Sequence, residues 1–137
     1  MKKLIFSLAI VLAFFSFSAM QTDTKPVFKW VEETHDFGKV PQGKPVTVDV
    51  QFTNVGTEPL IISSVEPACG CTVAKFTATP IKKGQKGSIT LTYNAAAAGA
   101  FIKATTVKSN ATEPVKVIYI KGEVMAPSGT TTAPTAH

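Results

Sequence analysis

The residues of this chain that are best suited to chemistry are two cysteines, Cys69 and Cys71, separated by a single glycine. Two thiols at this spacing could form a disulfide, exchange disulfides with another protein, or hold a soft ion such as Cu(I). A structural zinc site needs four ligands, and the only histidines that the chain could add are His35 and His137. Zinc is therefore disfavoured, whereas the other three interpretations stay open.

Two of the three remaining interpretations of Cys69 and Cys71, the structural disulfide and the exchange of disulfides, are weakened by the spacing and by the surrounding sequence. A disulfide that closes so short a loop stabilises a protein by about 1.6 kcal/mol through chain entropy, against about 3 kcal/mol for a 15-residue loop. Thiol oxidoreductases usually carry CxxC at the start of a helix that lowers the thiol pKa; no helix is predicted here, and Lys75 is the nearest cation. We therefore predict a disulfide or thiol site at this pair, and no catalytic, cofactor-binding or metal-binding residue.

The other polar residues do not form an active-site pattern. His35 and Asp36 are adjacent, and adjacent residues of a strand point to opposite faces, so Asp36 is badly placed to orient His35. Glu32 and Glu33 are adjacent in the same way and are typical of a solvated strand end. The sequence Asn110-Ala111-Thr112 matches a glycosylation sequon but is more simply a turn. We expect that the protein is not an enzyme.

The segments that must position the cysteines have the pattern of β-strands. In residues 45–53, valine and phenylalanine alternate with polar residues, which is typical of a strand with one buried face. Turns rich in Pro and Gly separate such runs at intervals of roughly 8–12 residues. We predict an all-β domain, an immunoglobulin-like antiparallel β-sandwich of about seven strands. The expected extended segments are 27–31, 34–40, 45–53, 60–65, 73–76, 88–93, 101–108 and 115–124.

The first residues have the plan of a secretory signal peptide. Two lysines precede an apolar run at residues 4–17, and small residues follow it, so we predict a signal peptide at residues 1–20. The apolar run is shorter than the roughly 20 residues that span a bilayer, and no lipoprotein cysteine follows it. We expect export to the periplasm or the exterior, with no stable membrane anchor after cleavage. Residues 27–124 would form one domain and residues 125–137 a disordered tail.

The charge of the chain argues against nucleic acid as a partner. The formal net charge of +5 falls to +3 without Lys2 and Lys3 of the signal peptide. The chain has no arginine, which is the residue that most often recognises phosphates and base edges, and its lysines are scattered.

Several landmarks, in their order along residues 30–124, resemble a known bacterial family. They are His35-Asp36-Phe37-Gly38, Phe52-Thr53-Asn54-Val55-Gly56, Cys69-Gly70-Cys71-Thr72, Gly99-Ala100-Phe101 and Ile120-Lys121-Gly122. Together they resemble the family called "domain of unknown function 1573". The resemblance implies an exported immunoglobulin-like domain, similar in architecture to sperm-protein-like domains of cilia and centrosomes and to periplasmic pilus chaperones. It implies no established chemistry.

We therefore expect an exported, non-enzymatic immunoglobulin-like module with a binding or structural role in the bacterial cell envelope, where its partners are proteins. The alternative is a thiol-redox or copper-binding protein that uses Cys69 and Cys71. A further expected mode of binding is the addition of a partner's strand to a free edge of one sheet. The sequence does not indicate which edge that is. Phe28, Trp30 and Tyr119 are candidate contact aromatics, of which the first two are better suited to packing.

Overall fold

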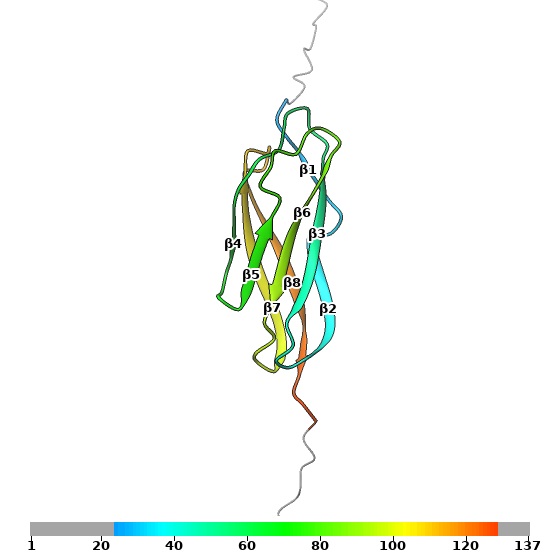
Figure 1. The fold of residues 1–137 in the computed structure, drawn as a ribbon, viewed down its shortest axis with the longest axis vertical. Coiled ribbons are helices and arrows are strands. Elements are labelled where there is room, and N and C mark those ends of the chain that lie inside the picture. Colours follow the sequence, from blue (N-terminus) through cyan, green and yellow to red (C-terminus); the bar gives the residue numbers. More distant parts are fainter. Residues whose placement is uncertain (1–23, 129–137) are drawn as a thin grey trace, which may run out of the picture.

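The structure, a computed structural model, describes residues 24–128, which form eight strands and no helix (Figure 1). The predicted signal peptide at residues 1–20 lies outside the described residues. Residues 129–137 of the predicted tail also lie outside them. The strands are β1 (Phe28–Trp30), β2 (Thr34–Pro41), β3 (Val46–Asn54), β4 (Ile62–Pro67), β5 (Thr72–Phe76), β6 (Lys86–Tyr93), β7 (Gly99–Ser109) and β8 (Val115–Met125). Nowhere from Thr24 to Ser128 is there a helix of a length and apolarity that would cross a membrane.

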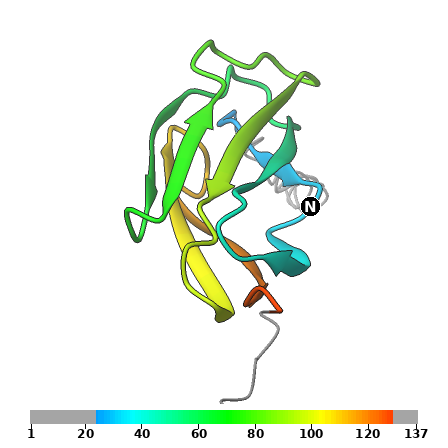
Figure 2. The ribbon, with the colours of Figure 1, turned by 60° about the horizontal axis from the view of Figure 1, so that its bottom comes forward.

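The strands form two sheets of four that face each other (Figures 1 and 2). Sheet 1 has the order β1-β3-β6-β5, and sheet 2 has the order β2-β8-β7-β4. The predicted all-β, immunoglobulin-like sandwich is confirmed, with eight strands where about seven were expected.

One pairing departs from the antiparallel arrangement of the rest of the sandwich. β2 runs parallel to β8, with Thr34 opposite Tyr119 and Pro41 opposite Met125. The register shifts between Asp36 and Lys39, where Gly38 has a φ of 66°, a left-handed conformation that glycine adopts without steric cost. The parallel direction arises because the chain leaves sheet 1 after the short β1 and enters sheet 2 as an edge strand beside β8.

The alternation of apolar and polar residues decides which face of each strand is buried. In β3, Val50 and Phe52 are 2% and 0% exposed, and in the neighbouring β6 Ile89 and Leu91 are both 0% exposed. Ile118 and Ile120 of β8 are equally buried and close the core from the side of sheet 2. Burial of apolar surface at about 25 cal/mol per Å² is the main force that holds the two sheets together.

Two strands that follow each other in the chain lie at the same side of the sandwich but belong to different sheets. β4 is an edge of sheet 2, and β5 is an edge of sheet 1 (Figures 1 and 2). The turn between them, residues 68–71, carries both cysteines. β1 and β2 form the corresponding pair of edges at the other side.

Candidate functional site

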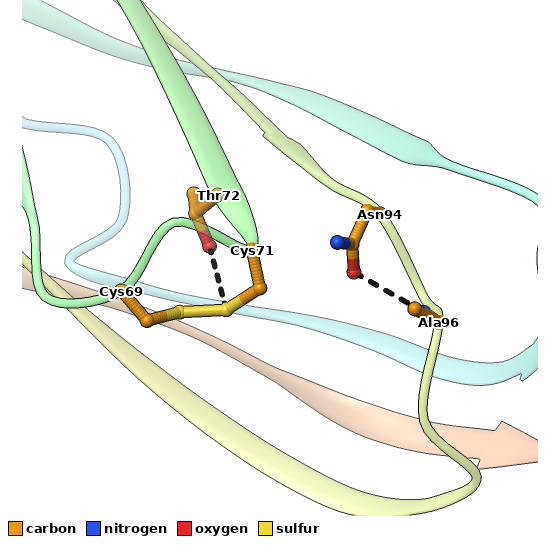
Figure 3. Close-up of a disulfide and its surroundings, with 5 residues drawn as sticks. All are labelled: Cys69, Cys71, Thr72, Asn94 and Ala96. Atoms are coloured by element: carbon orange, nitrogen blue, oxygen red, sulfur yellow. Dashed lines mark hydrogen bonds between the residues drawn. A yellow bond between two sulfur atoms is a disulfide. The ribbon is translucent and has the colours of Figure 1, made fainter.

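Cys69 and Cys71 form a disulfide in the turn that takes the chain from β4 to β5 (Figure 3). Their Cα atoms are 5.3 Å apart. Both cysteines are half-buried, Gly70 between them is exposed, and the side chain of Cys71 packs against the hydrophobic core. The pair therefore lies at a boundary between the core and solvent.

Backbone hydrogen bonds from both sheets hold this turn. The Ala68 N–H donates to the carbonyl oxygen of Ala104 in sheet 2 over 2.9 Å, and the Asn94 N–H donates to the carbonyl oxygen of Cys71 over 3.0 Å. The Thr72 N–H donates to the carbonyl oxygen of Cys69 over 3.4 Å, which closes the turn. The turn is thus part of the connection between the sheets and not a loose loop.

A second tight turn follows β6 and lies beside the disulfide (Figure 3). The side-chain oxygen of Asn94 accepts a hydrogen bond of 3.1 Å from the Ala96 N–H. Ala95 between them is fully buried and has a φ of 52°, a left-handed conformation that costs an alanine about 1 kcal/mol. Its carbonyl oxygen accepts from the Gly43 N–H over 2.8 Å, which ties this turn to the one that precedes β3.

The bonded cysteines do not have the chemistry of free thiols. A disulfide sulfur is neither a thiolate nucleophile nor a thiolate metal ligand. The Cys71 sulfur lies 4.0 Å from the hydroxyl oxygen of Thr72, at the limit of a weak hydrogen bond. Within residues 24–128, no group of three or more His, Cys, Asp and Glu side chains is arranged to hold a metal ion.

His35 lies far from the cysteines, because β2 and β4 are opposite edges of sheet 2. Its Nδ1 is 2.7 Å from a carboxylate oxygen of Glu32. Its ring packs edge-on against the ring of Phe37, and the two ring centroids are 4.7 Å apart. Asp36 instead accepts a hydrogen bond of 2.8 Å from the Gly38 N–H. The structure therefore does not bring the two cysteines, His35 and Asp36 together.

Glu33 and the sequon residues also have structural partners. Lys116 Nζ lies 2.9 Å from Glu33, and this hydrogen bond raises the pKa of Lys116 above its ordinary value of 10.5 despite the opposing effect of desolvation. The Asn110 carboxamide accepts from the Ile61 N–H over 2.8 Å and donates to the Pro59 carbonyl over 3.1 Å. These bonds agree with the interpretation of the sequon as a turn.

Sequence reasoning missed the most extensively bonded polar side chain of the core, Asn54. Its carboxamide oxygen accepts from the N–H groups of Val27 and Gly56, and its nitrogen donates to the carbonyl oxygens of Glu58 and Ile81. The Asn-x-Gly spacing at the end of β3 indicated a turn. It could not indicate that segments from three other parts of the chain meet at this side chain.

The outer face of sheet 2 carries apolar side chains where solvent would favour polar ones. On this face Ala104 lies opposite Tyr119, and its neighbours on the same face complete a group that we call the apolar stripe. The apolar stripe consists of Ile102, Ala104, Val115, Val117 and Tyr119. Ile102 is 70% exposed, Val115 56% and Tyr119 40%. Tyr119 is one of the three candidate contact aromatics, whereas the other two, Phe28 and Trp30, pack on Phe52 with ring centroids 4.8 and 5.2 Å from it.

A sequence model of a protein family described as "protein of unknown function (DUF1573)" matches residues 28–124. The chain belongs to this family. The suspected resemblance is thereby confirmed, and it extends over most of the described part of the chain. No curated protein matches this DUF1573 chain by sequence.

Solved structures with low sequence identity share the fold of this DUF1573 domain. A protein of unknown function from Porphyromonas gingivalis W83 superposes with a TM-score of 0.67 and 21% identity over 80% of this chain. A PapD-like domain of human CEP192 gives a TM-score of 0.57 at 11% identity, covering 75% of this chain and 87% of that domain. The YadV chaperone gives a TM-score of 0.53 at 16% identity, and the match covers 77% of this chain and 54% of the chaperone chain. The chain spans about half the length of the P. gingivalis protein, 51% of it.

Proposed function

We propose that this DUF1573 domain is an exported, non-enzymatic binding module of the bacterial cell envelope, and that its partner is a protein. The apolar stripe on sheet 2 is the observation that carries the proposal. Three of its side chains, Ile102, Val115 and Tyr119, are between 40% and 70% exposed on one continuous face of two paired strands. A contiguous exposed apolar patch with a polar rim is typical of protein interaction surfaces.

The charges around the apolar stripe favour a protein over a polyanion. At one side Lys108 lies 3.3 Å from Glu66, and at the other Lys121 lies 3.9 Å from Asp36. Each lysine is thus accompanied by a carboxylate, so the rim has little net charge. A nucleic acid or an anionic lipid surface would call for an excess of positive charge there, whereas a protein surface with an apolar centre matches this rim.

The assignment of a non-enzymatic role is supported by the partners of the reactive side chains. The cysteines are bonded to each other, His35 is bonded to Glu32, and Asp36 is bonded to a backbone N–H of its own strand. These groups are used within the scaffold and do not converge on a shared cavity.

A site-specific photo-crosslinker tests the proposal. With the crosslinking residue at position 119, we expect a discrete protein adduct in the envelope fraction of the bacterium that encodes the protein. Position 31 is the matched control, because Val31 is an apolar residue that is 74% exposed outside the apolar stripe. A DUF1573 chain that stays in the cytoplasm with its first residues uncleaved, or identical adduct patterns at the two positions, would overturn the proposal.

A further inference from the structure

The four edge strands of the sandwich differ in how they are protected against pairing with another chain. β2 has a shift of register at Gly38 and ends in Pro41, and β4 has a shift of register after Ile62 and ends in Pro67. β1 has three residues. Shifts of register, proline, shortness and exposed lysines are the usual means by which proteins blunt a sheet edge, and of these β5 carries a lysine, Lys75. β5, Thr72–Phe76, has five residues in unbroken register with β6 and contains no proline.

The hydrogen bonds at the two ends of β5 identify its outward backbone groups. The Asn94 N–H donates to the carbonyl of Cys71, and the Thr77 N–H donates to the carbonyl of Ser88. Because backbone direction alternates along an antiparallel strand, the odd-numbered residues between them face β6. The N–H and C=O groups of Ala74 and Phe76 therefore point away from the sheet. From Thr24 to Ser128, no loop or side chain bonds to them.

The side chains beside this edge specify what an added strand should carry. On the inner side, Ala74, Phe76 and the neighbouring Val65 of β4 are partly buried against the core. An added strand could cover them further by directing apolar side chains inward. On the outer side, Lys75 is exposed and is the charged residue of β5. An acidic residue opposite Lys75 would form a cross-strand pair of opposite charge.

We propose that β5 is the edge at which this domain takes up an extended segment of a partner protein, with apolar residues at alternate positions and an acidic residue opposite Lys75. The proposal rests on the binding role proposed above and adds to the apolar stripe of sheet 2 a second contact surface, the β5 edge of sheet 1. The backbone groups of Ala74 and Phe76 supply affinity, and the side-chain alternation supplies selectivity. A partner segment with an acidic residue fits this edge better than a second copy, because a second β5 paired antiparallel about Lys75 would place the two lysines opposite each other, and like charges directly opposite are destabilising.

Amide hydrogen exchange followed by NMR tests the proposal on the folded domain. In the free protein, the amides of Ala74 and Phe76 should exchange fast, while those of Val73 and Lys75 are protected by β6. The probe is a blocked eight-residue peptide in which valine alternates with serine and glutamate. At millimolar concentration it should slow exchange at Ala74 and Phe76 by about tenfold or more.

Two variants decide whether the effect comes from the β5 edge. Ala74→Pro removes an outward N–H and no bond to β6, so it should abolish the protection by the peptide. Lys75→Glu should weaken the binding of the glutamate peptide. The same variant should bind a peptide that has lysine in place of glutamate. Lys29→Glu is the control for charge alone, because Lys29 is exposed on β1 at the other side of sheet 1.

Three results would overturn the proposal. They are unchanged exchange at β5 with millimolar peptide, protection that appears at β2 or β4 instead, and protection of β5 that rises with protein concentration when no peptide is present. The last result would assign the edge to a second copy. None of them affects the crosslinking test at position 119, so failure of the strand addition is distinguishable from failure of the binding role.

Discussion

The carboxamide of Asn54 offers the sharpest test of how this sandwich is held together. Asn54 is 0% exposed and makes four hydrogen bonds, two as acceptor at 3.0 and 3.3 Å and two as donor at 2.7 and 2.8 Å. Each such bond contributes about 0.5–1.5 kcal/mol net. Asn54→Ala removes all four and leaves three backbone groups, the N–H groups of Val27 and Gly56 and the carbonyl of Glu58, without partners, although water that enters can replace part of these bonds. The fourth group, the carbonyl of Ile81, still accepts a hydrogen bond from the Leu60 N–H. We expect the free energy of unfolding to fall by about 3 kcal/mol.

Fluorescence of Trp30, the single tryptophan, provides the assay. Its ring stacks on the ring of Phe28, with the two centroids 4.6 Å apart. The tryptophan becomes solvated on unfolding, so its emission follows unfolding by denaturant and by heat directly. The loss of about 3 kcal/mol corresponds to a fall in Tm of about 12–24 °C for a domain of this size. Asn110→Ala is the matched control, because Asn110 makes two similar backbone bonds but is exposed, and should cost about 1 kcal/mol. The reasoning is refuted if Asn54→Ala costs no more than Asn110→Ala.

Three further changes probe other parts of the scaffold. Gly87→Ala should lower the free energy of unfolding by about 1–3 kcal/mol in denaturant titrations, because the new Cβ would lie 2.6 Å from the Phe52 ring; a neutral effect would mean that the ring moves freely. Replacing Cys69 and Cys71 together by serine should preserve the fold and cost no more than about 2 kcal/mol in the same assay, because the disulfide closes a very short loop; a larger loss would make it a main staple of the sandwich. Folding raises the pKa of Lys116, so the folded state binds this proton more tightly and Tm should fall as pH rises above 10.5; Lys116→Gln should show a smaller fall, and an unchanged pH profile would contradict this assignment.

The strands could be predicted from the sequence to within a few residues because their burial is local information. The alternation in residues 45–53 corresponds to the buried and exposed faces of β3, whose observed bounds are Val46–Asn54. The direction of β2 could not be predicted in this way, because alternation is the same for parallel and antiparallel strands. What makes β2 parallel to β8 is the path of the whole chain, in which a short first strand pairs with one sheet and the next strand pairs with the other.

The candidate site shows the same division between local and distant information. The sequence placed Cys69 and Cys71 at a strand end, and the structure confirms that they lie directly between β4 and β5. Their surroundings could not be predicted, because Ala104 and Asn94, whose backbone groups hold the turn, are distant in the chain. The same holds for Asn54, whose partner Ile81 is 27 residues away.

The parallel pairing of β2 and β8 has a mechanical consequence. The described chain enters at one end of the long axis of the sandwich and leaves at the other (Figure 1). A force that pulled these ends apart would, once β1 had detached, pass from β2 directly to β8. Because the two strands run in the same direction and the force acts along them, their hydrogen bonds would be loaded in shear and would have to break together. Thr34–Pro41 and Val115–Met125 therefore form a clamp that resists extension.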